Sequence, residues 1–540
     1  MLGLLRAVGF IALFAGYASS HPKPAPSPVS TTTCQGKTYT YKELAGFGSI
    51  PSDARDKFGD TISIGSAARL TNWKKTTNPK TKQTTYTGTL YGLPDRGWNT
   101  QGTQNTIPRV HLFDITFTPT SGRSPNLLFT YRNTILLTSP QGDPLTGLDP
   151  DSYISSLGPS FPKLPTSSYP GDGFGGNSSS SPGGTRIALD AEGLLLNSDG
   201  SFWISDEYGP YLYLFSPQGK MLQAVSPPDA ILPVRNWTSG SPSFSSDNAP
   251  IFNSQKRPTP RDPVAGRQNN QGFEGLTGSP ERADGKRDIW VMLQSAGRLE
   301  GGQNAATRRN ARLLKYHVDN HGKGKGKGKS EDQREIKLEE EYVVPLPVFT
   351  DAQGRKRVAA QSEIHYVSDD QLLVLPRDSS VGACTDNPTS IYRHVDVIDV
   401  KKATDIKGKY DGFNESVASL DGVLKSEIKP AALCPWIDFN VNEELSKFGL
   451  RNGPQLAGLP TSSLLNEKWE SLVLVPVEED KHGDTYEYFL FAISDNDFIT
   501  QNGFINGGKI PYKDASGCSL DQQTLVFRVT FPKGSKPLIG

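Results

Sequence analysis

The chain repeats one pattern of apolar and polar residues four times. In each copy a glutamate opens a short apolar run, a turn follows, and a second apolar run ends in an acid or an amide. Short apolar runs on either side of a tight turn predict the two strands of a β-hairpin. We therefore expect four hairpins with acidic or amide side chains at their open ends. The copies run from Glu192 to Glu207, from Glu274 to Gln294, from Glu363 to Asp378 and from Glu470 to Asp497.

A further alternating run follows each predicted hairpin and ends at a turn. These runs occupy residues 211–219, 311–319, 394–400 and 524–532. A fifth copy, which lacks the glutamate, comes earlier in the chain at residues 90–97 and 109–117. Each copy has the order strand, turn, strand, connection, strand, which predicts three antiparallel strands.

Repeats of this kind also predict how the sheets assemble. Three strands with one buried face cannot exclude water alone, so such repeats stack around a centre or along a line. Closing the array into a ring protects the sheet edges. The copies lie farther apart than the about 40 to 50 residues of a typical blade. We therefore expect an all-β fold, a single β-propeller of about six or seven blades with long inserted loops. A pair of β-sandwiches is the alternative topology.

The composition agrees with strands and turns. The 540 residues include 54 Gly and 41 Pro but only 3 Met, and no long segment has helical periodicity. Apolar residues make up 35% of the chain, which is enough for a large core. The formal net charge of zero gives no reason to expect a nucleic acid or an anionic membrane as a partner.

The first twenty residues resemble a secretory signal peptide. Arg6 precedes an apolar run at 8–15, and Ala18 to Ser20 supply the small residues of a cleavage site before His21. A membrane anchor is the alternative, but the run is short for a spanning helix. We expect a signal peptide at 1–20, a disordered Pro- and Ser-rich lead-in at 21–33 and one domain at 34–540 of a secreted, extracellular protein, with no membrane contact after cleavage.

The chain has four cysteines, an even number for a protein of an oxidising compartment. Two disulfides are expected, and three pairings would satisfy that number. We favour Cys384 with Cys434 and Cys34 with Cys518, because the second pair would join the two ends of the domain. A metal site is the weaker interpretation, since no Cys-x-x-Cys spacing occurs.

Three Asn-x-Ser/Thr triplets predict N-glycans on a secreted protein. They begin at Asn177, Asn236 and Asn414, each in a polar or turn-rich stretch.

The turns of the predicted hairpins place the acids together. Asp199-Gly200 is a strong hairpin turn, and counting back from it sets Glu192 opposite Asp206 and Glu207. The later copies place their acids in the same way, at the end opposite the turn. If these hairpins supply the inner strands of neighbouring blades, their carboxylates converge at the mouth of a central channel.

Converging carboxylates predict a metal site. Hard oxygen ligands favour calcium or magnesium over zinc, and calcium is the expected ion outside the cell. In the alternative interpretation, each glutamate accepts backbone hydrogen bonds at a strand end and binds no metal. The candidate ligands are Glu192, Asp206, Glu207, Glu274, Glu363, Asp378, Glu470, Asp495 and Asp497.

The acids and the arginines beside them predict a hydrolytic role. Glu192 or Glu274 would accept a proton from the attacking water, and Arg96 or Arg377 would hold an anionic substrate. An internal ion pair is the simpler interpretation of an arginine beside a carboxylate. Other catalytic patterns are missing from the sequence, which contains neither Gly-x-Ser-x-Gly nor His-Glu-x-x-His.

Several segments resemble one known family. They are Asp190-Ala-Glu-Gly-Leu, Gly200 to Pro210, Asn270 to Leu276, Leu375 to Asp378, Ser494 to Phe498 and Pro94 to Gly97. As a set, they resemble the phytase-like family, described as having esterase-like activity of phytase. The resemblance covers residues from about 60 to 530 and implies a secreted β-propeller with calcium-dependent phosphoesterase or esterase activity. The Asp-Ala-Asp-Asp-Pro-Ala segment of the calcium-dependent propeller phytases is absent, so phytate hydrolysis is not implied.

Three hypotheses about function follow. The first is a metal-dependent hydrolase of phosphate or carboxylate esters that acts on a small anionic or ester substrate. The second is a non-catalytic extracellular propeller, stabilised by calcium, that binds a glycan or a protein. The third is a propeller lactonase that would use the same metal site.

Overall fold

The computed structural model is an all-β fold, as the sequence predicts. It describes residues 27–119, 124–158, 160–175, 182–319, 334–378, 380–385, 387–454, 461–478 and 486–540. The predicted signal peptide at 1–20 and the triplet at Asn177 lie outside these residues. Within them, no helix is long and apolar enough to cross a membrane.

Four sheets have four antiparallel strands each, in chain order. The first contains β3 (Ala67–Thr77), β4 (Thr84–Leu93), β5 (Arg109–Phe117) and β6 (Leu127–Leu136). The second contains β10 (Ala191–Leu196), β11 (Phe202–Asp206), β12 (Leu212–Phe215) and β13 (Met221–Val225). The third contains β14 (Phe273–Gly278), β15 (Lys286–Leu293), β16 (Asn310–Asp319) and β17 (Glu335–Pro345). The fourth contains β20 (Ala360–Ser368), β21 (Gln371–Arg377), β22 (His394–Asp399) and β23 (Ala432–Asp438).

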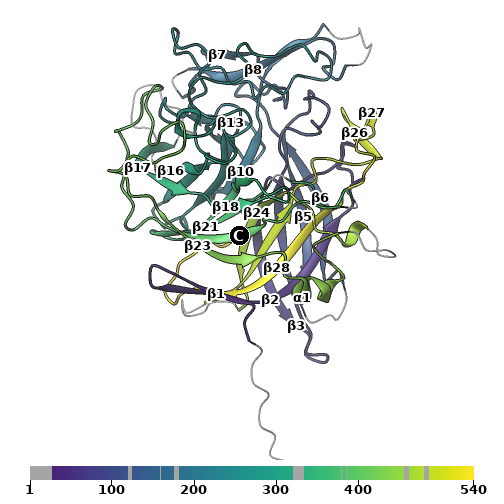
Figure 1. The fold of residues 1–540 in the computed structure, drawn as a ribbon. Coiled ribbons are helices and arrows are strands. Elements are labelled where there is room, and N and C mark those ends of the chain that lie inside the picture. Colours follow the sequence, from purple (N-terminus) through teal and green to yellow (C-terminus); the bar gives the residue numbers. More distant parts are fainter. Residues whose placement is uncertain are drawn as a thin grey trace, which may run out of the picture.

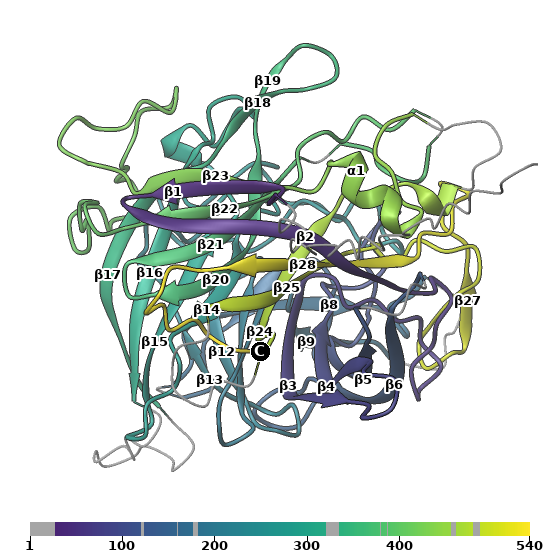
Figure 2. The same ribbon diagram turned by 90° about the horizontal axis from the view of Figure 1, so that it is seen from below.

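The fifth sheet joins the two ends of the described chain. Its strand order is β24 (Trp469–Pro476), β25 (Glu487–Ser494), β28 (Gln522–Thr530), β2 (Lys37–Ile50) and β1 (Ser30–Cys34). Figure 2 shows purple β2, from the N-terminal part, beside yellow β28, from the C-terminal part. Backbone hydrogen bonds between β2 and β28 therefore join the two ends of the domain, in place of the predicted disulfide between Cys34 and Cys518.

The remaining elements are short. A three-stranded sheet of β7 (Ser152–Ile154), β8 (Leu164–Tyr169) and β9 (Gly184–Ile187) lies at one end of the molecule, away from β1 and β2 (Figure 1). The other short elements are β18 (Val348–Thr350) with β19 (Lys356–Val358), β26 (Gly503–Ile505) with β27 (Ile510–Tyr512), α1 (Asn442–Leu445), η1 (Arg298–Glu300), η2 (Ser446–Phe448) and η3 (Thr461–Ser463).

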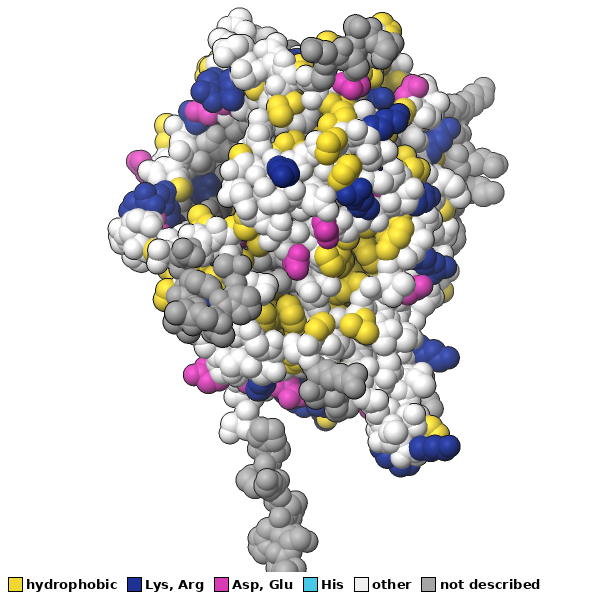
Figure 3. All heavy atoms as spheres, turned by 90° about the vertical axis from the view of Figure 1, so that its right-hand side faces the viewer, with side chains coloured by type: hydrophobic (Ala, Val, Ile, Leu, Met, Phe, Trp, Pro, Cys, Tyr) yellow, Lys and Arg dark blue, Asp and Glu magenta, His cyan; other side chains and the backbone are white. Residues whose placement is uncertain are grey.

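The five larger sheets contact one another through their first strands. β3 contacts β10, β10 contacts β14, β14 contacts β20, β20 contacts β24, and β24 contacts β3, which closes the cycle. The apolar core lies between neighbouring sheets. For example, Leu194 and Phe202 of the second sheet pack with Leu93 and Val110 of the first. The surface in Figure 3 carries charged side chains of both signs, scattered among polar and apolar ones.

Three sequence predictions about the fold need correction. The larger sheets number five among the described residues, where we expected six or seven blades. Each has at least one outer strand beyond the predicted three, such as β6 in the first sheet and both β1 and β2 in the fifth. Part of the predicted disordered lead-in is ordered, since Ser30–Cys34 pairs with β2 as a strand.

Two disulfides form, as predicted, but the favoured pairing is wrong. Cys34 bonds to Cys434 and Cys384 bonds to Cys518, with Cα–Cα distances of 5.7 and 5.9 Å. The reason is that β1 lies against β23 of the neighbouring sheet, which brings Cys34 beside Cys434. The disulfide at Cys34 therefore ties the fourth sheet to the fifth.

An arginine holds the centre of the cycle together. The buried guanidinium of Arg69 on β3 donates to the carbonyl oxygens of Leu276 on β14 at 2.5 Å and of Leu472 on β24 at 3.2 Å. It also forms an ion pair with Glu363 on β20, at 3.3 Å. One side chain therefore links four of the five inner strands.

Candidate functional site

The repeat glutamates stand at irregularities of the inner strands. In the second sheet Ala191 pairs with Asp206 and Gly193 pairs with Ser205, so Glu192 is an extra residue without a partner. Such β-bulges turn a side chain away from the regular alternation of the strand. The pairing is interrupted in the same way at Glu274, Glu363 and Glu470.

The glycine after the first two glutamates permits close contact between sheets. A Cβ on Gly193 would lie 2.4 Å from the Cβ of Leu276 in the next sheet. A Cβ on Gly275 would lie 2.8 Å from Oε1 of Gln361 in the sheet after that. The repeated Glu-Gly-Leu therefore combines a bulge that aims an acid with a glycine that lets the inner strands approach.

A cavity of about 490 Å³ lies where three of these glutamates gather. Charged and amide side chains dominate its wall. The acids are Asp95, Glu192, Glu207, Glu274, Glu467, Glu470 and Asp497; the cations are Arg96, Arg308, Arg377 and Lys468. The other lining residues are Asn99, Asn269, Asn270, Gln271, Gln294, Ser380 and Val381.

One group of three buried acids lies at the second sheet. Oxygen atoms of Asp190, Glu192 and Glu207 are within 4.8 Å of one another. Burial raises the pKa of Glu192 well above its usual value, and the nearby charges of Glu274 and Asp190 raise it further. The pKa of Asp190 rises to about 6 because of burial, although Arg96 opposes the shift. Close carboxylates whose ionisation is suppressed in this way favour binding of a cation.

A second group joins the first sheet to the fifth. Oxygen atoms of Asp95, Asp495 and Asp497 also lie within 4.8 Å of one another. Burial raises the pKa of Asp95 to about 7, with a further contribution from Asp190. Lys468 lies at this group, with its Nζ 2.5 Å from Asp497 and 3.7 Å from Asp495.

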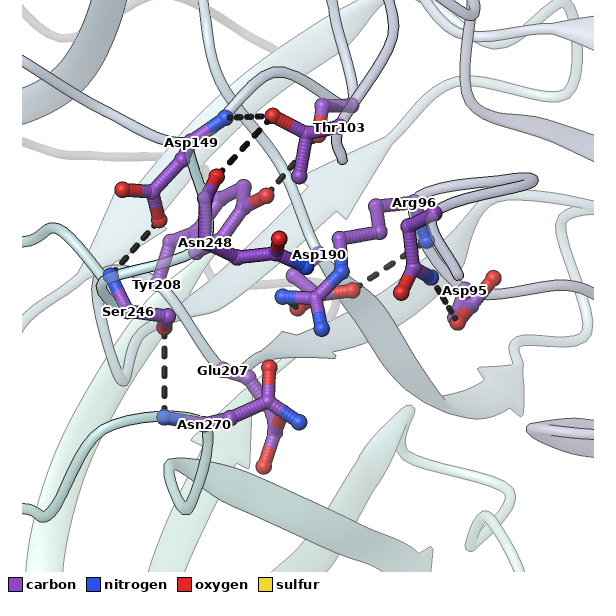
Figure 4. A network of polar contacts seen from close by, with 12 residues as sticks. Asp95, Arg96, Thr103, Asp149, Asp190, Glu207, Tyr208, Ser246, Asn248 and Asn270 are labelled. Atoms are coloured by element: carbon purple, nitrogen blue, oxygen red, sulfur yellow. Dashed lines mark hydrogen bonds and ion pairs between the residues drawn. The ribbon is translucent and has the colours of Figure 1, made fainter. Parts of the chain in front are cut away.

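Two arginines of the wall have acid partners. Arg96 donates to Asp190 at 2.6 Å, beside Glu207 and Tyr208 (Figure 4). Arg377 forms an ion pair with Glu470. Burial opposes the ionisation of Glu470, but Lys468 and Arg377 together hold its pKa below the usual value. The cavity wall therefore carries both paired and unpaired charged side chains.

Two buried carboxylate oxygens at this site accept no hydrogen bond among the described residues, although one of them, Oδ2 of Asp495, lies 3.7 Å from Nζ of Lys468. Oε2 of Glu274 and Oδ2 of Asp495 accept no hydrogen bond there. Gln294 satisfies the other oxygen of Glu274, at 2.8 Å. Buried acceptors without donors are costly, and a divalent cation is a suitable partner for them. The donor set is all oxygen, so it fits calcium or magnesium better than zinc.

The structure brings most of the predicted site residues together. Seven of them line the cavity, and Asp495 lies in the second acid group. The seven are Arg96, Glu192, Glu207, Glu274, Arg377, Glu470 and Asp497.

Three predicted ligands lie elsewhere. The buried carboxylate of Asp206 accepts three backbone N–H groups, and that of Asp378 accepts backbone N–H groups and the hydroxyl of Ser390. Glu363 pairs with Arg69. The three acids contact backbone N–H groups, the hydroxyl of Ser390 and the guanidinium of Arg69, and none of them lines the cavity.

Several residues of the site stand outside the repeat pattern of the sequence. Asp190 and Lys468 each stand two residues before a repeat glutamate, just before the inner strand begins. Asp95 belongs to the copy that lacks the glutamate. Arg308 lies in a loop with no recognisable pattern, so only the fold brings it to the cavity.

A third possible metal-binding group lies on outer strands, away from the cavity. Asp288, His317 and Glu339 come from β15, β16 and β17. Lys315 approaches Asp288 to 3.6 Å and balances part of its charge. This group offers a natural control for experiments on the cavity.

Comparison with known proteins decides the family. A family model described as phytase-like, esterase-like activity of phytase, matches residues 81–498. A protein of Arthroderma benhamiae named "Uncharacterized secreted protein" is 44% identical over 494 residues, which cover 88% of this chain and 90% of its own. This chain belongs to the phytase-like family. The relative and the two disulfides confirm the prediction of a secreted protein.

Two solved structures are only weakly similar to this phytase-like protein. The Chaetomium thermophilum Nup170 NTD–Nup53 complex is 10% identical, with a TM-score of 0.28, and the match covers 92% of this chain and 58% of that one. The GH43 protein BlXynB from Bacillus licheniformis is 9% identical, with a TM-score of 0.20 and coverage of 94% and 97%. Both TM-scores are too low to relate the folds.

Proposed function

We propose that the five larger sheets are the blades of one five-bladed β-propeller and that its central cavity binds calcium. The closed cycle of first strands supports the propeller, because each sheet then buries both faces against its neighbours. The pairing of β2 with β28 supports closure of the last blade by the N-terminal segment.

The observation that carries the metal proposal is the pair of three-carboxylate groups at the cavity. Asp190, Glu192 and Glu207 would hold one ion. Asp95 and Asp495 would hold a second, after Lys468 gives up part of its contact with the group. Calcium accepts several carboxylate oxygens in flexible geometry, which suits acids from different sheets.

The reaction that suits this cavity is hydrolysis of a phosphate or carboxylate ester. Calcium supplies Lewis acidity and a template for substrate oxygens. Glu274 has an oxygen without a hydrogen-bond donor among the described residues, so its carboxylate, once ionised beside a bound cation, is placed to accept a proton from water. Arg377, which also contacts Glu470, orients the negative oxygens of the substrate.

Turnover of chromogenic phosphate and carboxylate esters tests this function. We expect hydrolysis in calcium and its loss in a chelator. The double variant Glu192→Gln, Glu274→Gln should lose about a hundredfold in rate, since it removes two groups of the reacting wall. Glu443→Gln, at an exposed position on α1, is the matched control and should keep full activity. Equal rates in the double variant and the control would refute the hydrolase.

One observation favours a second function. Arg96 and Arg377 already have acid partners, which is the arrangement of a structural ion-pair network. A non-catalytic extracellular propeller stabilised by calcium would show calcium-dependent melting and no turnover of any ester. A lactonase would use the same site, and sugar lactones in the substrate panel separate it from the esterase.

N-glycans are proposed at the two described triplets. Asn236 and Asn414 are exposed, and their neighbours Trp237 and Phe413 contact each other with ring centroids 5.9 Å apart. Protein secreted from a eukaryotic host should lose mass on treatment with peptide N-glycosidase. Asn236→Gln and Asn414→Gln should each remove one glycan, and an unchanged mass in either variant would contradict the proposal for that residue.

A further inference from the structure

Arg308 differs from the other cations of the cavity wall. Arg96, Arg377 and Lys468 each contact at least one carboxylate. Arg308 forms no side-chain hydrogen bond and no ion pair with any residue that the structure describes. Three cations are therefore neutralised within the protein, and one is left with its charge uncompensated.

The surroundings of Arg308 are unfavourable for an isolated guanidinium. Its Nε is buried without an acceptor among the described residues. Burial lowers the pKa of Arg308, and the nearby charges of Arg377 and Arg357 lower it further. Arg308 is half-buried, and a partly desolvated cation next to two other cations costs free energy unless an anion accompanies it.

The same cavity is also lined by neutral donors. Oε1 of Gln271 accepts from the hydroxyl of Ser295, which fixes the amide so that its NH₂ group is the free end. That NH₂ group has no partner among the described residues, and neither has the hydroxyl of Ser380. A guanidinium together with amide and hydroxyl donors is a typical binding site for an oxyanion, because the planar guanidinium can donate two parallel hydrogen bonds.

We propose that Arg308, with Gln271 and Ser380, forms a subsite that binds an oxyanion of the ligand, a phosphate or a carboxylate group. The acids Glu192 and Glu274 would bind a cation, so the cavity has separate places for a cation and an anion. What the subsite implies about the substrate rests on the proposed hydrolase function. If the protein hydrolyses esters, the subsite defines its substrates as esters that carry an anionic group. Binding of the anion itself does not depend on turnover.

Calorimetric titration of the full-length mature protein tests the subsite. The protein is first stripped of metal on a chelating resin, and inorganic phosphate or malonate is titrated at constant ionic strength. We expect the wild type to bind at least one of the two, and the choice between them identifies the oxyanion. Arg308→Gln should weaken this binding by about tenfold or more, the range expected for a lost hydrogen bond between charged groups.

Two further variants make the result specific. Arg309→Gln changes the exposed neighbour, which does not line the cavity, and should bind as the wild type does. Arg308→Lys keeps the charge without the planar fork and should bind with intermediate strength. Equal melting temperatures in the absence of anion would show that Arg308→Gln folds.

The outcomes separate the subsite from the hydrolase. Failure of the wild type to bind either anion, or equal binding by Arg308→Gln and Arg309→Gln, would overturn the subsite. Anion binding that depends on Arg308, without turnover of any ester, would contradict only the hydrolase. Turnover of esters without any effect of Arg308→Gln on the KM for anionic relative to neutral esters would contradict only the subsite.

Discussion

Removing calcium is expected to lower the free energy of unfolding by about 4 kcal/mol, relative to protein at a calcium concentration about a thousand times the dissociation constant. The physical reason is that the acids around the cavity repel one another when no cation is present. Glu192 illustrates this repulsion, since burial and the neighbouring acids Glu274 and Asp190 all disfavour its charged form. Denaturant unfolding with calcium and with a chelator measures the difference.

Variants locate the effect. Replacing Asp190, Glu192 and Glu207 by their amides should remove the part of the calcium dependence that the first ion contributes, because its three charged ligands are lost together. Glu192→Gln alone should stabilise the metal-free protein, since it relieves the repulsion from Glu274 and Asp190 and leaves the ion pair of Asp190 with Arg96 intact. Glu339→Gln alters the acid group on the outer strands and should leave the calcium dependence unchanged. Unfolding that is identical with and without calcium would refute the metal site.

Local sequence signals were sufficient to place some of the acids of the site. The hairpin turn at Asp199-Gly200 fixes the register of β10 and β11, so Glu192 and Glu207 were correctly expected at one end. The same reasoning placed Glu274 and Glu470. It did not reveal the bulges, which depend on how closely the next sheet approaches Gly193 and Gly275.

Non-local pairing could not be predicted in the same way. Cys34 meets Cys434 only because β2 joins the last sheet and carries β1 to the edge of the fourth. No turn or periodicity in the sequence specifies that arrangement. Arg308 is a similar case, since its loop reaches the cavity through packing of the whole third sheet. The repeat pattern therefore missed the residues that meet their partners only when segments distant in the sequence pack together.

The separation of roles among the repeat glutamates has an energetic basis. Glu192 and Glu274 face the cavity among other acids, where a cation can compensate them. Glu363, by contrast, contacts Arg69 and accepts the backbone N–H groups of Leu276 and Ile364. One sequence pattern thus produces ligands at some sheets and a structural ion pair at another. The difference comes from the neighbour on β3, and the pattern itself does not contain it.

At the centre of the cycle of first strands, the ion pair between Arg69 and Glu363 should dominate the contribution to the free energy of unfolding. Arg69→Met is expected to destabilise the protein by about 3 to 5 kcal/mol at pH 8, because it leaves a buried carboxylate without its partner. The loss should be smaller at pH 5, where Glu363 is protonated. Lys447→Met, which removes an exposed ion pair with Glu444, should cost about 1 kcal/mol or less at either pH.

The pH dependence has a definite sign. Burial raises the pKa of Glu363 to about 7, from 4.5 in the unfolded chain, although Arg69 opposes the shift. The folded state therefore binds the proton more tightly, and this contribution to stability is complete below about pH 4.5 and is lost as pH rises through 7. The loss amounts to about 3 kcal/mol. Glu363→Gln should remove it, so its unfolding free energy should change less than that of the wild type between pH 5 and 8.

A double variant completes the test. Replacing both partners, as Arg69→Met with Glu363→Gln, leaves no buried charge and should recover much of the stability that Arg69→Met loses at pH 8. Denaturant unfolding of the four proteins at pH 5 and 8 gives the coupling free energy directly. If Arg69→Met loses the same free energy at both pH values, the carboxylate is not the group left uncompensated. Arg69 would then act on the ring through its carbonyl contacts with Leu276 and Leu472 alone.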